Sequence, residues 1–252
     1  MAENTKTIQL RMDTVNTVSK ITNAMKLVSM SKLQGYQRKL EELEALVREF
    51  EEIQTESFAQ TEELPVLAVC VASDLGLASL YNQTVRRAMA KKDPDAVLWT
   101  GHQGYDRIER DQEFHLVNEK TSSDNLDLEK LYNQLLDYME DYDLQLAVPM
   151  MKGDSLEVEW RELNRQLLHS DFVIYEPDYE TANQRYQEFY IYLTLYETYY
   201  QAKYSENMTR RIAMDQATEN ANEMREELRN LYNQIRQEQI TQEILELAAG
   251  VE

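Results

Sequence analysis

The residues best placed for chemistry form a short loop, Ser73-Asp74-Leu75-Gly76, which follows an apolar run at Leu64–Ala72. In α/β folds, the loop after the first strand is a common ligand site. This loop has neither the spaced glycines of a dinucleotide site nor the Lys-Ser/Thr pair of a P-loop. Asp74 has the chemistry of a general base or a metal ligand, but no second acidic residue or histidine stands at a recognisable spacing from it. We therefore expect Asp74 to cap a turn.

Other reactive side chains are few. His102, His115 and His169 fall on separate expected elements, without the spacing of metal ligands. Cys70, the single cysteine, lies inside the apolar run and is expected to be a buried strand residue rather than a reactive thiol. The sequence therefore predicts no catalytic residue, no cofactor and no metal site. An enzyme built on Asp74 is the weakest of the alternatives.

The elements around the loop predict a small middle domain. A strand, a helix at Leu80–Lys91 and a second strand at Ala96–Thr100 make a βαβ unit, which indicates a parallel sheet. The alternation of strands and helices predicts a Rossmann-like α/β domain. The remaining candidates are a strand at Phe114–Val117, a helix at Leu126–Tyr142, and strands at Leu144–Met150, Leu156–Trp160 and Phe172–Tyr175.

Helix breakers are almost absent outside this domain, because every glycine and proline except Gly35 and Gly250 lies between Pro65 and Pro177. A helix over Asp178–Ala249 would be on the order of 100 Å long, so it must extend beyond its domain and needs a cover for its apolar stripe. The expected fold class is α+β, with a long antiparallel coiled coil and a small α/β domain. We expect a helix over residues 1–64, the α/β domain over 65–177, and a second helix with a protruding tip over 178–252.

Apolar residues in both terminal segments recur in steps of three and four, as in a coiled-coil seam. Both series are interrupted by polar positions, which in the C-terminal segment are Lys203, Asn207 and Arg210. Aligning the interruptions predicts antiparallel helices in which residue n lies opposite roughly residue 242 minus n. The N-terminal series is Val15, Val18, Ile21, Met25 and Val28, then Leu40, Leu43, Val47, Phe50 and Ile53; the C-terminal series is Tyr186, Phe189, Leu193, Tyr196 and Tyr200, then Met214, Ala217, Ala221, Met224, Leu228, Leu231 and Ile235.

The C-terminal segment continues past its expected partner on a changed stripe of Ile240, Ile244 and Leu247. We expect this tip to project as a single helix whose apolar side chains need a hydrophobic socket, fraying being the alternative. The net charge of −20 argues against nucleic-acid binding. The first 40 residues are basic, which suits either a solvated face or an acidic partner. The apolar runs are too short for a membrane span, and the polar start with a single cysteine favours the cytoplasm.

Two stretches resemble a known family. Lys20-Ile21-Thr22-Asn23-Ala24-Met25-Lys26-Leu27-Val28-Ser29-Met30-Ser31-Lys32-Leu33 resembles the N-terminal helix signature of the gamma subunit of rotary F-type ATP synthases. The C-terminal signature of that family is similar to Met214-Asp215-Gln216-Ala217-Thr218-Glu219-Asn220-Ala221, Leu231-Tyr232-Asn233, Arg236-Gln237 and Ile240-Thr241-Gln242-Glu243-Ile244-Leu245-Glu246.

The resemblance implies a central stalk, a non-catalytic coiled coil that turns inside a ring of alternating alpha and beta subunits. It couples proton or sodium flow to ATP synthesis or hydrolysis, at the cytoplasmic face of the membrane. Arg236 and Gln237 match a pair that contacts a loop of one beta subunit, and Ile240, Ile244 and Leu247 fall in a stretch that enters an apolar sleeve. Met25 matches a position that faces the lower end of a beta subunit, where acidic loops of beta act as levers that push on the shaft. Lys20, Lys26 and Lys32 would be the charge partners of these acidic levers.

The resemblance is weakest in the middle domain. Family members usually carry Ser-Asp-Arg-Gly-Leu, then a small residue and two glycines, whereas this chain has Leu75 and Ala78-Ser79-Leu80. In the family this region docks an epsilon subunit and the proteolipid ring, so these two contacts have the least support here. Two alternatives stay open. One is a divergent gamma-like stalk that joins a rotary head to other machinery, and the other is a non-rotary coiled-coil scaffold.

Overall fold

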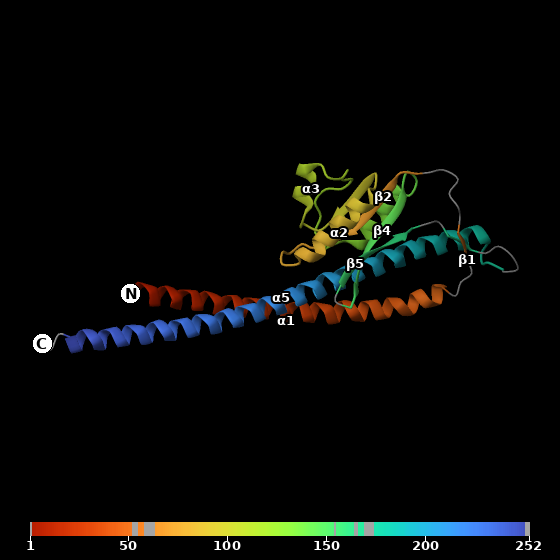
Figure 1. The fold of residues 1–252 in the computed structure, drawn as a ribbon. Coiled ribbons are helices and arrows are strands. Elements are labelled where there is room, and N and C mark those ends of the chain that lie inside the picture. The colour runs from red at the N-terminus through yellow and green to blue at the C-terminus, as the bar shows by residue number, and fades with distance from the viewer. Residues whose placement is uncertain are drawn as a thin grey trace. The chain divides into compact units, whose positions relative to one another are not determined.

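The computed structural model describes residues 2–51, 55–57, 64–153, 155–163, 166–168 and 174–249. The chain forms two compact units, one of Met1–Met30 with Arg210–Glu252 and the other of Ser31–Thr209, called the tip unit and the body unit below. Two long helices, α1 (Ala2–Glu51) and α5 (Tyr179–Ala249), contribute to both units (Figure 1). Long terminal helices around a small sheet confirm the predicted fold class. The three-part domain division stays a prediction.

The body unit contains a four-stranded sheet with the order β3-β2-β4-β5. Strand β2 pairs in parallel with both β3 and β4, whereas β5 returns antiparallel to β4. Helix α2 (Ser79–Lys92) connects β2 to β3, so the predicted βαβ unit is confirmed. The strands are β2 (Val66–Val71), β3 (Ala96–Thr100), β4 (Asp143–Lys152) and β5 (Ser155–Glu162).

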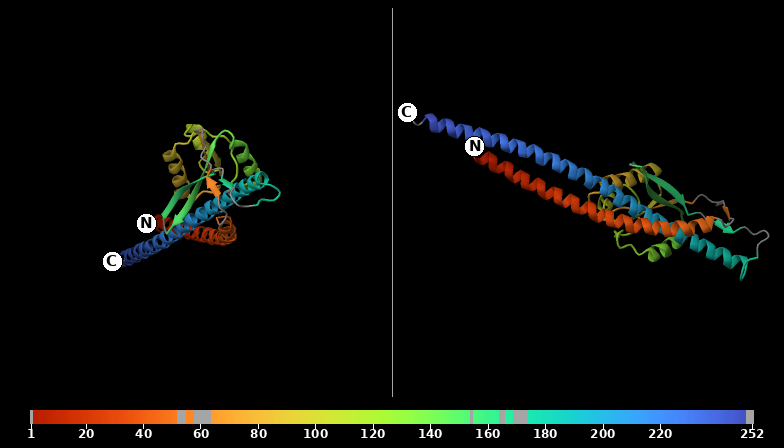
Figure 2. Two further views of the ribbon diagram at one scale, coloured as in Figure 1. Left: turned by 90° about the vertical axis from the view of Figure 1, so that its right-hand side faces the viewer. Right: turned by 90° about the horizontal axis from the view of Figure 1, so that it is seen from below.

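Helices cover both faces of this sheet, as Figure 2 shows. Leu67 and Val69 share a core with α4 (Leu128–Tyr138) and α5, whereas Ala68 and Cys70 share one with α2 and α3 (Tyr105–Asp111). This alternation arises because successive strand residues point to opposite faces. Cys70 is buried, as predicted, and burial raises the pKa of its thiol.

Several predicted elements need correction. Phe114–Val117 forms one parallel bridge, from Leu116 to Val97, and no strand, because the Asn118 side chain takes the place of backbone beside Trp99 before Thr121 bridges to Thr100. Leu126–Tyr142 shortens to α4, whose first turn Asp127 caps by accepting from the Lys130 amide. Helix α3 and the small antiparallel pair of β1 (Thr55–Ser57) with β6 (Gln166–Leu168) were not predicted. Ile53, His169, Phe172 and Val173 and the side chain of Val47 lie outside the described residues, and Ile174 and Tyr175 are not in a strand.

The predicted seam of α1 is wrong in the tip unit. Val18, Ile21 and Val28 are 44%, 54% and 59% exposed, whereas Thr22 and Ser29 are buried. The predicted series took two consecutive steps of three after Val15, but a coiled-coil face needs threes and fours to alternate. The less exposed residues of α1 keep that alternation as Ile8, Met12, Val15, Ser19, Thr22, Lys26 and Ser29.

The antiparallel register is close to the predicted one in the tip unit. Ser19 donates to Asn222, Lys26 pairs with Asp215, and the Thr22 and Thr218 hydroxyls lie 2.7 Å apart. Each observed partner lies within two residues of the expected position. The pairing direction and register are therefore confirmed, although polar side chains make these contacts.

Candidate functional site

Asp74 is held by surrounding donors in the body unit. Its carboxylate accepts from the Ser122 hydroxyl at 2.6 Å and from the amides of His102, Ser123 and Asp124 at 3.0, 3.1 and 2.7 Å. Burial alone would raise the pKa of Asp74, but these hydrogen bonds lower it to about 2. The carboxylate is a weak base, and it joins its own loop to the loops that contain His102 and Ser122. The expected structural role is therefore confirmed, although Asp74 stabilises three loops and not one turn alone.

The other candidates for chemistry do not converge on Asp74, apart from His102. The Nδ1 atom of His102 lies 3.1 Å from the Asp74 carboxylate, and that imidazole is 46% exposed. His115 lies on a separate loop, beside an open groove next to α3. Across the described ranges, no three His, Cys, Asp or Glu residues are close enough together to hold a metal ion. Over the same ranges, no helix is both long and apolar enough to cross a membrane.

A buried polar cluster joins the middle-domain loops to α5 within the body unit. The Lys203 side chain is fully buried, and its Nζ donates to Ser123 at 2.7 Å, to Asp124 at 2.7 Å and to Glu206 at 3.0 Å. Lys32 from α1 reaches the other Asp124 oxygen at 3.0 Å. Burial would raise the pKa of Asp124, but the two lysines outweigh it and hold the pKa below its usual range. We call Lys32, Ser123, Asp124, Lys203 and Glu206 the lysine cluster.

The lysine cluster explains the polar interruption of the predicted seam. Tyr199 donates to the Ser123 carbonyl at 3.0 Å, and Ser205 donates to the Pro149 carbonyl at 2.7 Å. Asn207 is 1% exposed. This part of α5 packs against backbone carbonyl groups of a loop and of β4, which need donors when they are buried. The polar interval is therefore where the middle domain packs on α5, a role that the sequence analysis missed.

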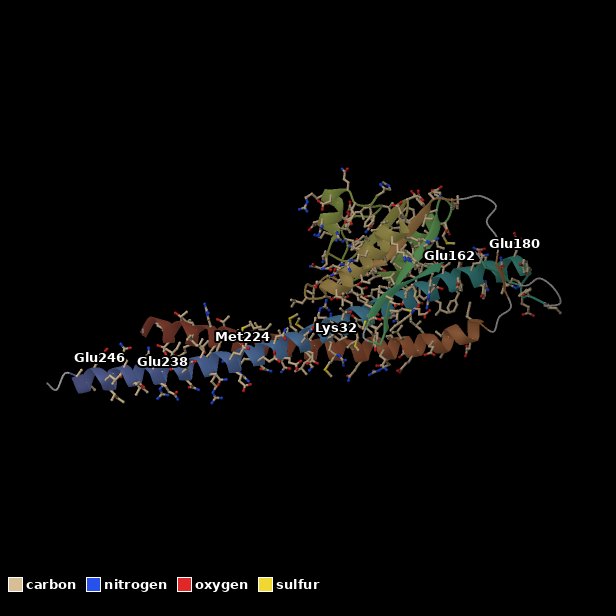
Figure 3. All side chains as sticks on the ribbon, in the orientation of Figure 1. Lys32, Glu162, Glu180, Met224, Glu238 and Glu246 are labelled. Carbon is tan, nitrogen blue, oxygen red and sulfur yellow. The ribbon has the colours of Figure 1, made fainter. Side chains whose placement is uncertain are left out.

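The predicted head-contact residues on α5 are exposed in the tip unit. Arg236 and Gln237 are exposed, and Ile240, Ile244 and Leu247 are 44%, 60% and 72% exposed. Helix α5 continues past the first turn of α1, as Figure 2 shows. The surface of this segment is also rich in acidic side chains, among them Glu238 and Glu246 in Figure 3. The apolar stripe of the tip therefore meets solvent in this chain.

The predicted contacts on α1 fall in two different environments. Met25 is half-buried and Lys26 pairs with Asp215, both in the tip unit. Lys32 belongs to the body unit, where Asp124 engages it. Lys20 is exposed and forms no ion pair with any described residue. Of the three lysines, Lys20 is thus the one without an ion-pair partner among the residues that the structure describes.

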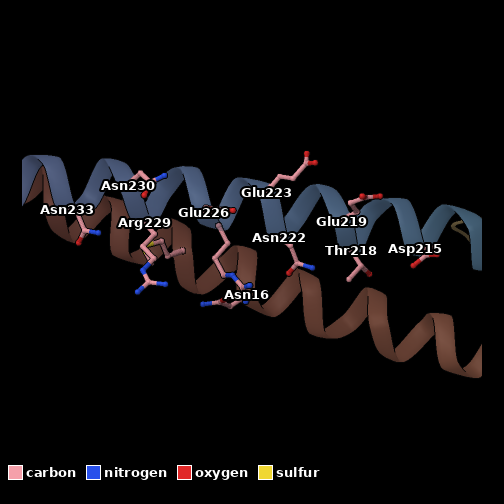
Figure 4. Close-up of a pocket in the computed structure, with 12 residues that line it drawn as sticks. Asn16, Asp215, Thr218, Glu219, Asn222, Glu223, Glu226, Arg229, Asn230 and Asn233 are labelled. Carbon is pink, nitrogen blue, oxygen red and sulfur yellow. The ribbon is translucent and has the colours of Figure 1, made fainter.

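The tip unit also carries two open grooves between α1 and α5. The larger, of about 1370 Å³, is polar and includes Asn16, Asp215, Asn222 and Glu226 in its lining (Figure 4). The smaller, of about 480 Å³, is mostly apolar and lies beside Leu10, Val15, Met224 and Leu228. Neither holds an arrangement of nucleophile, base and oxyanion donors. The surface of this unit suits contact with a protein better than it suits catalysis.

Comparison with known proteins gives a consistent result. The family model described as ATP synthase matches residues 4–252. The sodium ion specific ATP synthase gamma chain of Acetobacterium woodii is 33% identical over 138 residues, which are 47% of this chain and 44% of that protein. The ATP synthase gamma chain of Ureaplasma urealyticum is 26% identical over 133 residues, 48% of this chain and 46% of that protein. The aligned stretch thus spans less than half the length of these curated relatives.

Solved structures show the same fold at low identity. One chain of the Euglena gracilis mitochondrial ATP synthase in rotational state 3 matches with a TM-score of 0.72 and 15% identity, covering all of this chain and 94% of that one. A chain of the Tetrahymena thermophila mitochondrial central stalk and c-ring matches with a TM-score of 0.58 and 20% identity, covering 78% of this chain and 99% of that one. Since the family model spans nearly the whole chain and both curated relatives are gamma chains, this chain belongs to the ATP synthase gamma-subunit family.

Proposed function

We propose that this chain is the non-catalytic central rotor shaft of a rotary ATPase. It would turn within a ring of alpha and beta subunits and couple ion translocation to ATP synthesis or hydrolysis. The observation that carries the proposal is the inverted seam of the tip unit. There, hydroxyl groups of Ser19, Thr22 and Ser29 take the sheltered positions while Ile21 and Val28 face outward. A helix pair adapted to stand alone in water would bury the apolar side chains instead.

The outward stripe calls for a partner that surrounds the helix pair. Exposed apolar residues occur on both helices, and they include Leu10, Ile21 and Val28 on α1 and Ile240 and Ile244 on α5. Many exposed apolar side chains on one helix pair suggest an interaction site. A ring of alpha and beta subunits, the setting that family membership implies, would cover both helices at once. The complex would lie at the cytoplasmic face of a membrane.

The contacts proposed for the ring follow the family signatures. Arg236 and Gln237 would contact a loop of one beta subunit, and the stripe of Ile240, Ile244 and Leu247 would seat in an apolar sleeve. Of Lys20, Lys26 and Lys32, Lys20 is best suited to an acidic lever because no described residue pairs with its charge. Lys26 and Lys32 would pair with the lever only after leaving their present partners, the carboxylates of Asp215 and Asp124.

The test is reconstitution with alpha and beta subunits. Arg236→Ala with Gln237→Ala should reduce coupled ATP turnover, because each lost charge-assisted contact costs about 1.5–3 kcal/mol. The matched control is Arg229→Ala with Asn230→Ala, two helical turns earlier on the same face. If the control pair impairs coupling as much as the test pair, the assigned contact is wrong. Failure of the chain to copurify with alpha and beta subunits would refute the rotor proposal altogether.

The divergent-stalk alternative has one specific observation in its favour. Leu75 and Ala78-Ser79-Leu80 depart from the family pattern in the domain that would meet an epsilon-type subunit and the proteolipid ring. Copurification with alpha and beta subunits, but without those two partners, would favour a stalk that joins the head to other machinery. A non-rotary scaffold predicts instead that the isolated chain is a stable helical rod without any partner.

A further inference from the structure

Asp124 is shared by the two long helices within the body unit. One oxygen of its carboxylate accepts from Lys203 on α5 at 2.7 Å, and the other accepts from Lys32 on α1 at 3.0 Å. The Asp124 amide in turn donates to the Asp74 carboxylate at 2.7 Å, and Asp74 also accepts from the amide of His102. A single residue thus connects α1 and α5 to the loops that follow β2 and β3.

Lys203 uses its full hydrogen-bonding capacity in this arrangement. An ammonium group has three donors, and here they reach Ser123, Asp124 and Glu206 at 2.7, 2.7 and 3.0 Å. Two of these acceptors belong to the loop before α4, so only one rotational setting of α5 satisfies all three donors. Turning α5 by one residue, about 100°, would move the buried ammonium away from the loop and leave it without those acceptors.

A buried ion pair of this kind contributes little to stability for its cost. Apolar residues of similar volume are often as stabilising, because two charges lose their hydration when they are buried. Buried polar groups in long helices serve most clearly to fix register, as a single asparagine does in a coiled coil. Lys203 lies in the polar interruption of the apolar series of α5, which is the place where a register-fixing residue would act.

The middle domain holds the two long helices in different ways. Its apolar cores include Ile191, Leu195, Tyr199 and Ala202 of α5. Over the ranges that the structure describes, these cores include no apolar side chain of α1. The ion pair of Lys32 with Asp124 therefore gives α1 a direct connection to the middle domain that is charged and partly exposed.

We propose that Lys203, Lys32 and Asp124 are positioning residues that fix the rotational setting of α5 and α1 against the middle domain. A shaft that carries torque to or from that domain must not slip against it. Lys203 prevents slip of α5, and Lys32 holds α1 to the same carboxylate. The mechanical role rests on the proposed function, whereas the fixed setting is a property of the chain alone.

The first experiment measures the setting of α5 in the full chain by electron spin resonance. Spin labels on cysteines introduced at Gln83 of α2 and Arg185 of α5, both exposed positions, should give one narrow distance distribution in the parent. The native Cys70 is buried and stays unlabelled. Lys203→Met with Glu206→Met fills the site with apolar side chains, and it should widen the distribution about twofold or split it in two.

Two controls separate the rotational setting from stability. Leu195→Ala destabilises the chain through a cavity in the apolar core between α5 and the sheet, but it leaves the ion pairs intact, so the distribution should stay narrow while the chain is folded. Glu129→Met with Lys130→Met makes the same replacement at exposed positions of α4 and should change nothing. A narrow distribution in Lys203→Met with Glu206→Met, or equal widening in Leu195→Ala, overturns the proposal for α5.

The setting of α1 is measured in the same way with labels at Gln34 and Gln83, which are also exposed. Asp124→Asn removes the charge that Lys32 and Lys203 share, and it should widen this distribution about twofold, whereas Asp124→Glu should keep it narrow. The matched control is Asp106→Asn, which breaks an ion pair with Lys120 inside the middle domain. Equal widening in that control, or none in Asp124→Asn, contradicts the role assigned to the shared carboxylate.

The last experiment tests the mechanical role in a complex with alpha and beta subunits. A bead attached at Gln83 reports the rotation of the middle domain when ATP drives the ring. Lys203→Met with Glu206→Met should broaden the angular stopping positions of the bead about twofold, whereas Leu195→Ala should leave them as sharp as in the parent. Sharp positions in the double variant contradict the mechanical role. If the chain does not assemble with alpha and beta subunits, the rotor proposal fails, and the spin-label distances still decide whether the setting is fixed.

Discussion

Replacing Lys203 with methionine should destabilise the body unit strongly. The substitution keeps the length of the side chain but removes the cation that compensates Glu206, which is 2% exposed. Breaking a buried pair by removing one partner costs about 3–5 kcal/mol. Asp124 loses less, because its side chain is 27% exposed and keeps the ion pair with Lys32. We therefore expect a loss of about 3 kcal/mol, at the low end of that range.

The assay is thermal and urea unfolding of the full chain, followed by far-ultraviolet circular dichroism. A loss of about 3 kcal/mol corresponds to a fall in midpoint temperature of roughly 6–12 °C for a chain of this size. Lys130→Met, the same change at an exposed lysine, should shift stability by less than about 0.5 kcal/mol. The double variant Lys203→Met with Glu206→Met should recover part of the loss, because it removes both members of the buried ion pair. A Lys203→Met chain within about 1 kcal/mol of the parent would refute the reasoning.

Three further outcomes follow from single contacts. The pKa of Asp74 is lowered from 3.8 to about 2, so the ionised carboxylate contributes roughly 2 kcal/mol to the free energy of unfolding above about pH 4. This contribution is lost as the pH falls toward 2. Asp74→Asn should therefore make the stability measured by urea unfolding less dependent on pH in that range. Thr22→Val with Thr218→Val replaces both partners of one hydrogen bond by apolar groups of similar shape, and thermal unfolding should stay within about 1 kcal/mol of the parent, whereas a larger loss would mean that the hydroxyls hold the helix pair. Gly101→Ala would place a Cβ 2.3 Å from the Ala72 carbonyl oxygen at a φ of 100°, so the variant should lose several degrees of midpoint temperature, and an unchanged midpoint would contradict so close an approach of the two backbone segments.

The pattern of glycine, proline and apolar residues predicted the architecture well. Terminal segments almost free of glycine and proline indicated the two helices, and the βαβ unit indicated the parallel pairing of β2 with β3. These features follow from backbone chemistry that each residue carries locally. The short pair of β1 with β6 could not be predicted in this way, because its stability depends on segments more than 100 residues apart.

The seam of α1 shows where hydrophobicity alone misleads. Ile21 and Val28 mark an apolar stripe, but in the tip unit that stripe points away from α5. A sequence cannot distinguish an apolar face that meets its own chain from one that meets another protein. Alternating steps of three and four allow either Val18 or Ser19 after Val15, and both series then reach Thr22 in place of Ile21.

In the sequence, the lysine cluster was visible only as a polar interruption of the predicted coiled-coil seam. Lys203 is a polar gap in that seam, and nothing in its spacing indicates that it hydrogen-bonds to Ser123 and Asp124. Asp74 was easier to interpret, because an isolated aspartate after a strand commonly serves a loop. The roles of Arg236 and Gln237 rest on the family signature, since exposure alone does not identify a partner.

The wide sequence separation of α1 and α5 also has a consequence for synthesis of the chain. About 130 residues lie between the end of α1 and the start of α5. At a translation rate of about 5–20 residues per second, α1 would leave the ribosome roughly 6–25 s before α5 begins to emerge. During that interval α1 has neither its intramolecular partner nor any subunit around Ile21 and Val28. We expect the nascent N-terminal helix to depend on a holding chaperone until the last third of the chain has been made.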